Sequence, residues 1–120
     1  SRKKQLILEI TDHYNAGRTL LSEPSEKLKL VKFNIEAATK SRAATDYHAA
    51  LKFHKIAAEF LEDNEISSAL WRENHELAML LYREMAETEF LEGDKESAQR
   101  CIQIASNQAL SAIEKANILI

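Results

Sequence analysis

Glycine, proline and cysteine are scarce in this chain of 120 residues, which contains two, one and one of them. Because glycine and proline mark turns, their scarcity argues against a fold with many loops and β-turns. A single cysteine, Cys101, excludes an internal disulfide framework and a cysteine metal site, and its apolar surroundings predict a buried thiol. No apolar run approaches the ~20 residues of a membrane span. We therefore expect one soluble, cytoplasmic domain that forms part of a longer polypeptide.

Positive charge is also limited, because the formal net charge is −3 and the isoelectric point is near 5.8. This balance argues against nucleic acid and anionic membranes as partners. The charge is uneven, however: residues 1–55 carry a net +5 and residues 56–120 a net −8. Such an asymmetry can steer one half toward another protein element, although two solvated helical faces of opposite sign would give the same pattern.

Apolar residues recur every three or four positions along most of the chain, the pattern of amphipathic helices. No segment alternates with period two for long enough to be a strand. The pattern predicts an all-α fold with a first helix over 4–21, whose apolar stripe includes Leu6, Ile10 and Leu21. We expect Pro24 to start the second helix, with Ser22 or Ser25 as its cap. The remaining predicted helices run over 47–61, through 71–90 after a polar connection at 62–68, over 95–109, and onward from 111.

Small residues repeat at a spacing of 48, a pattern that predicts two similar helix pairs. Helices can approach closely only where side chains are small, so matched alanines have a physical reason. Thr45 or Asp46 is a credible N-cap in the first pair, and Gly93 and Asp94 form the matching turn in the second. We place repeat one at about 28–61 and repeat two at about 76–109 of a single domain spanning 1–120. The matched alanines are Ala38 with Ala86, Ala50 with Ala98, and Ala57 with Ala105.

The second unit, with Met85, Ala86, the Gly93-Asp94 turn and Ala98, resembles a tetratricopeptide repeat. The chain as a whole resembles one family region more closely. The resemblance lies in the order of three segments, "ITDHYNAGRTLL", "EKLKLVKFNIEAATKSRAATDYHAALKFHKIAAEFL" and "ELAMLLYREMAETEFLEGD". That region is the tetratricopeptide-like helical segment after the predicted AAA/STAND-type ATPase module of large multidomain bacterial signalling proteins, which include hybrid sensor histidine kinases and Ser/Thr kinases. The chain departs from the family at 38–40, where Ala-Thr-Lys replaces a segment that often contains glycine.

This resemblance implies a short tetratricopeptide-like solenoid with flanking cap helices and a non-catalytic role. The module would couple an ATPase to a kinase or other output through contacts with neighbouring domains of its own chain or with a signalling protein. No cofactor or metal is implied, and self-association of the isolated chain is a further expectation. If the repeats stack, their first helices line a candidate protein-binding groove. Its predicted lining, referred to below as the predicted groove, is Lys32, Ile35, Thr39, Arg42, Leu80, Arg83, Glu87 and Phe90.

Two other functions remain open, a histidine-phosphotransfer bundle and a free-standing peptide-binding adaptor. "YHAALKF" places His48 near a lysine, but Phe53 stands where the phosphotransfer family has glycine, and we expect its ring to obstruct an incoming receiver. "NHEL" at 74–77 resembles the start of a kinase phosphoacceptor box, yet the Arg-Thr-Pro that should follow is missing after His75. The carboxylates at 84, 87, 89 and 92 indicate a solvated face rather than an acid–base pair.

Overall fold

The computed structural model describes residues 2–119, with side chains through residue 118, and this part of the chain contains seven α-helices and no strand. The all-α prediction is confirmed. No helix among these residues has the length and apolarity needed to cross a bilayer. In chain order the elements are α1 (Arg2–Ala16), the 3-10 turn η1 (Arg18–Leu20), α2 (Pro24–Ala43), α3 (Tyr47–Phe60), α4 (Asn64–Glu73), α5 (His75–Leu91), α6 (Lys95–Gln108) and α7 (Ala112–Leu119).

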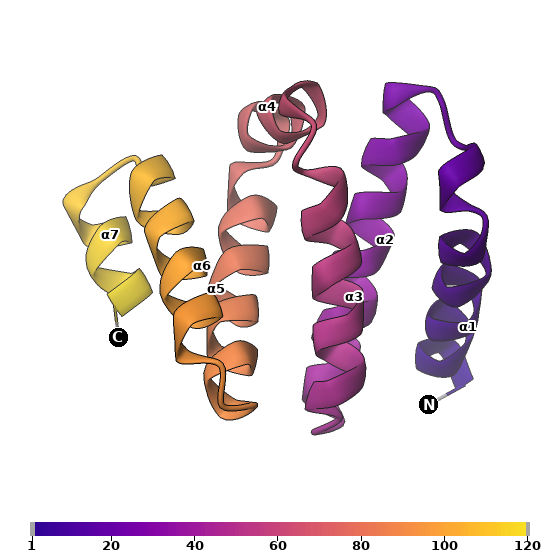
Figure 1. Cartoon of the computed structure of the whole chain (residues 1–120), viewed down its shortest axis with the longest axis horizontal. Helices are drawn as coiled ribbons and strands as arrows, with labels where there is room; N and C mark the ends of the chain where they lie inside the picture. Colours follow the sequence, from indigo (N-terminus) through magenta and orange to yellow (C-terminus); the bar gives the residue numbers. More distant parts are fainter. Residues whose placement is uncertain (1, 120) are drawn as a thin grey trace.

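Two helix pairs form the centre of the molecule, and the other helices flank them (Figure 1). Helix α2 packs along α3, and α5 packs along α6. The pairs meet through contacts of α5 with both α2 and α3, while α1 lies on α2 and α7 on α6. Short α4 crosses one end of the molecule and contacts α2 and α5.

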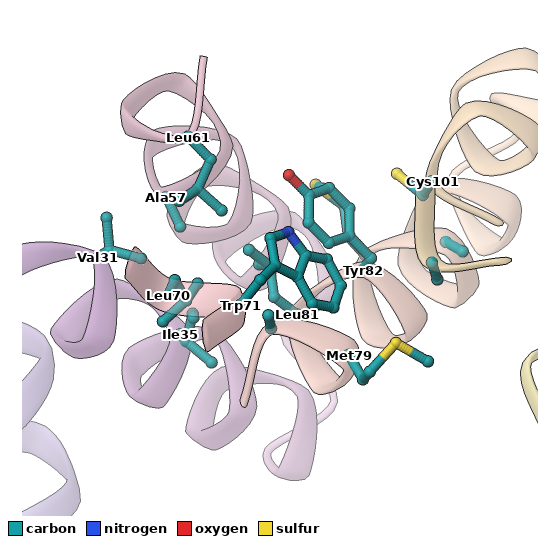
Figure 2. Close-up of a cluster of buried hydrophobic side chains, with 14 of the residues drawn as sticks. Val31, Ile35, Ala57, Leu61, Leu70, Trp71, Met79, Leu81, Tyr82 and Cys101 are labelled. Atoms are coloured by element: carbon teal, nitrogen blue, oxygen red, sulfur yellow. The ribbon is translucent and has the colours of Figure 1, made fainter. Parts of the chain in front are cut away.

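The largest core cluster lies between the two pairs and beneath α4, with α6 along its edge (Figure 2). Trp71 of α4 stacks on Tyr82 of α5, with ring centroids 5.8 Å apart and planes 6° apart. Leu70 and Leu81 are completely buried in the same cluster. All six alanines of the 48-residue pattern are buried as well, as expected of small residues at helix contacts.

The turns after α2 and α5 have the same geometry 48 residues apart. Asp46 Oδ1 accepts a hydrogen bond from the Ala49 amide at 3.1 Å, and Asp94 Oδ1 accepts one from the Ser97 amide at 3.0 Å. These bonds confirm both aspartates as N-caps. The residues before them are left-handed, with φ of 59° at Thr45 and 89° at Gly93.

The polar connection predicted at 62–68 and the continuous helix after it were wrong. Asp63 Oδ1 accepts a hydrogen bond from the Glu65 amide at 2.9 Å and starts α4 within the predicted loop. Ile66 and Leu70 then lie on the buried side of α4. Asn74, at φ −148° and ψ 61°, is non-helical and separates α4 from α5.

Helix α1 also differs from its prediction. It ends at Ala16 instead of 21, and the predicted stripe residue Leu6 is mostly exposed. Its buried contact is partly polar, since Asn15 and Asn34 exchange two amide hydrogen bonds of 2.8 Å between α1 and α2. Pro24 starts α2 as predicted, but Glu23 occupies the N-cap without a side-chain hydrogen bond, so neither Ser22 nor Ser25 caps.

Candidate functional site

Three of the four α2 residues of the predicted groove, Ile35, Thr39 and Arg42, pack in the core or against α5 rather than lining open surface. Ile35 is 1% exposed and belongs to the core, so it cannot line an open surface. Thr39 Oγ1 donates to Glu84 Oε1 at 2.8 Å, and the Arg42 guanidinium donates to Glu84 at 2.9 Å and to Glu87 at 2.8 Å. These side chains therefore hold the first helices of the two pairs together. Lys32 is half-buried.

The Arg42 contact also joins the positive and negative parts of the sequence. The Arg42 side chain is 19% exposed and that of Glu84 is 11% exposed, so this pair is mostly shielded from water. Burial lowers the pKa of Arg42, but the hydrogen bonds and charges of Glu87 and Glu84 outweigh burial and raise it overall. A second ion pair joins Arg18 of η1 to Glu59 of α3, with 3.5 Å between guanidinium nitrogen and carboxylate oxygen. This pair is more exposed than the Arg42–Glu84 pair, so it contributes less to stability.

Two of the four predicted solvated carboxylates are buried, which corrects the expectation for this stretch. Glu84 takes part in the Arg42 pair, and Glu89 lies near the end of α5 with little exposure. Burial raises the pKa of Glu89, while the nearby charge of Lys55 lowers it in part. Neither carboxylate can be identified as buried from sequence alone, because both occupy positions in a dense run of glutamates.

The α5 half of the predicted groove remains accessible. Arg83 is exposed and has no ion pair or hydrogen bond to any described residue, and Phe90 is 59% exposed. Leu80 is half-buried beside them, and Glu87 remains bound to Arg42. Arg83 lines two hollows, one of about 650 Å³ between α5 and α7 and one of about 670 Å³ bordered by α5, α6 and α7. Leu80, Arg83 and Phe90 are named here the α5 surface.

Helix α7 borders the α5 surface, and three hydrogen-bond contacts fix its start. Ser111 Oγ accepts a hydrogen bond from the Glu114 amide at 3.1 Å, which caps the helix. Glu114 Oε1 lies 2.9 Å from His75 Nε2 and accepts a hydrogen bond from the Leu110 amide at 2.8 Å. The hydrogen bond from the Leu110 amide, and to a smaller extent the one with His75, hold the pKa of Glu114 below its usual range.

The histidines differ sharply in accessibility. The side chain of His48, at the start of α3, is 98% exposed, whereas His54 is fully buried. Burial, with a smaller effect of the Arg42 charge, lowers the pKa of His54 to about 3. Phe53 is buried as well, so the predicted obstruction of His48 by this ring was wrong.

Cys101 is a free thiol within residues 2–118. No cluster of three potential metal ligands occurs among the described side chains. Cys101 is buried as predicted, and burial together with the charge of Glu89 raises its pKa to about 11. A thiol that is neutral at physiological pH is a poor nucleophile.

Comparison with known proteins finds one informative similarity. Hybrid signal transduction histidine kinase G of Dictyostelium discoideum is 29% identical to this chain over 107 residues. The alignment covers 86% of the chain but only 3% of the length of that protein. No family model and no solved structure matches the chain. The chain is thus similar to a small region of a much longer signal transduction protein.

Proposed function

We propose that this chain is a non-catalytic protein-interaction module within a larger signal transduction protein. The observation that carries the proposal is the alignment to a hybrid histidine kinase, in which nearly the whole chain corresponds to a very small part of a signalling protein. A segment of this size and helical architecture suits a connecting or regulatory role beside larger domains.

The helix pairs support a short tetratricopeptide-like solenoid as the architecture. Pairs α2–α3 and α5–α6 follow one another with the same capped turn and the same buried alanines 48 residues apart. Such stacking builds a continuous core from units that cannot bury their apolar faces alone. Helices α1 and α7 flank the two units.

The α5 surface is the proposed contact site for another protein domain. Phe90 offers a large exposed ring and Arg83 an unpaired guanidinium, and aromatic and arginine side chains contribute most often to binding energy in interfaces. The partners would be neighbouring ATPase and kinase domains of the same cytoplasmic polypeptide, whose activities the module would couple. Nucleic acid, membrane and cofactors play no part in this function.

The test combines Arg83→Glu with Phe90→Ser and measures binding of the chain to the isolated kinase and ATPase domains of its own polypeptide. We expect affinity for one of these domains to fall at least about tenfold, which corresponds to about 1.4 kcal/mol. Arg72→Glu, at an exposed position of α4, is the matched control and should bind normally. Equal binding by all three proteins would exclude the α5 surface. Arg42 is unsuitable here, because its substitution would disturb the contact between α2 and α5.

A second candidate function is phosphotransfer through His48. The exposed imidazole favours it, because a phosphoacceptor must reach an incoming receiver domain, and the similarity to a hybrid histidine kinase is consistent with it. Incubation with a phosphorylated receiver should then give acid-labile phosphate on the wild type and none on His48→Gln. Absence of label on the wild type would leave the interaction module.

A further inference from the structure

The turns after α2 and α5 share one hydrogen-bond pattern, which allows the two helices to be compared position by position. The Asp46 amide donates to the Ser41 carbonyl at 2.9 Å, and the Asp94 amide donates to the Glu89 carbonyl at 2.9 Å. Each residue of α5 therefore corresponds to the residue of α2 that lies 48 positions earlier in the sequence. One face of α2 then corresponds to one face of α5: Phe33 to Leu81, Glu36 to Glu84, and Lys40 to Thr88.

These corresponding faces differ in what covers them. On α5, Leu81, Glu84 and Thr88 are all buried; α2 and α3 both contact this helix, and Thr39 and Arg42 of α2 bind Glu84. On α2, Phe33 is only half-buried, and the Glu36 side chain is 50% exposed. The charged partner of Glu36 is Lys40 on the same helix, 3.8 Å away. Helix α1 reaches this face at Phe33 through Tyr14, but no hydrogen bond or ion pair from another described helix reaches Glu36.

An apolar hollow of about 520 Å³ adjoins this face, between α1 and α2. Ile7, Ile10, Leu30 and Phe33 are among its lining residues. The Tyr14 ring is 54% exposed and stacks on the Phe33 ring, with centroids 6.4 Å apart and planes 6° apart. Phe33 therefore connects the hollow to the open face of α2, and the two form one surface, named here the α1–α2 surface.

We propose that the α1–α2 surface binds an amphipathic helix of a partner protein that presents the same chemistry as the inner face of α2. That inner face carries Val31, Ile35, Thr39 and Arg42, which recur every three or four residues. The branched apolar residues would cover Phe33 and fill the hollow, and the arginine would pair with Glu36 as Arg42 pairs with Glu84. A second copy of this chain cannot supply that face of α2, because it is already packed against α5.

The binding test uses a synthetic peptide of residues 24–43, held helical by a staple on the side opposite Val31 and Ile35. Binding to the isotope-labelled whole chain is followed by amide chemical shifts. We expect changes concentrated around Tyr14, Phe33 and Glu36. Absence of changes, changes centred on α5 and α6, or dimerisation of the chain in place of peptide binding would each overturn the proposal.

A charge exchange tests the pairing with Glu36. The protein variant Glu36→Lys should bind the peptide about tenfold more weakly, and a peptide with Arg42→Glu should restore its affinity. Glu62→Lys, an exposed substitution beyond the end of α3, is the control and should bind like the wild type. Tyr14→Ala removes the stacked ring without changing charge and should also weaken binding. Equal affinity of Glu36→Lys and wild type for both peptides would contradict the proposal.

Discussion

Removal of the Arg42 guanidinium should destabilise the contact between the two helix pairs. In Arg42→Ala, Glu84 keeps only the Thr39 hydroxyl as a side-chain partner while it remains mostly buried. Removing one member of a buried ion pair costs roughly 3–5 kcal/mol. Because the Arg42 side chain keeps 19% exposure, water can partly solvate the remaining carboxylate, so we expect a loss of about 2–3 kcal/mol.

The assay is urea denaturation of the wild type, Arg42→Ala and Glu87→Ala, monitored by circular dichroism. Glu87 contacts the same guanidinium, but its side chain is 56% exposed, so its removal should cost less than about 1 kcal/mol. Glu84→Gln in the Arg42→Ala background should recover part of the loss, because it removes the unpaired charge. Equal, small effects of the Arg42 and Glu87 substitutions would show that the buried pair does not hold α2 to α5.

Three further predictions concern stability. Ala105→Leu should overpack the contact of α6 with the core and cost about 1–3 kcal/mol in urea denaturation; a neutral result would contradict the close packing there. His54 stays neutral in the folded chain, whereas in the unfolded chain it binds a proton below its ordinary pKa of 6.5. The free energy of unfolding should therefore fall by about 1.4 kcal/mol for each pH unit below 6.5. His54→Leu should remove this part of the pH dependence, and parallel curves would refute the assignment. Thr45→Gly should stabilise the chain by about 1 kcal/mol at its left-handed φ, and Gly93→Thr should cost a similar amount; calorimetry measures both.

Local signals predicted much of the fold. Asp46, Gly93 and Asp94 act through hydrogen bonds and backbone angles within a few residues, so the sequence alone was sufficient to locate those turns. The matched alanines were identified for a similar reason, since few other residues fit where helices meet closely. The proposed division into repeats and the predicted binding role of the groove residues remain predictions.

Long-range pairing explains the errors. Segment 62–68 is polar, but Asp63 caps a helix whose apolar residues become buried only when the two pairs come together. Arg42 and Glu84 are 42 residues apart and both resemble surface residues, so their mutual burial depends on the docking of α2 onto α5. The polar contact of Asn15 with Asn34 likewise lies outside any apolar pattern.

The most direct test of the proposed role uses the proposed parent polypeptide, with its ATPase and kinase domains, and measures its kinase output. Autophosphorylation and ATP hydrolysis would be measured for the wild type, for Arg83→Glu with Phe90→Ser, and for the Arg72→Glu control. If the module couples an ATPase to an output through the α5 surface, the double variant should hydrolyse ATP normally but lose the dependence of phosphorylation on that hydrolysis. A double variant with output and coupling identical to those of the wild type would contradict the account.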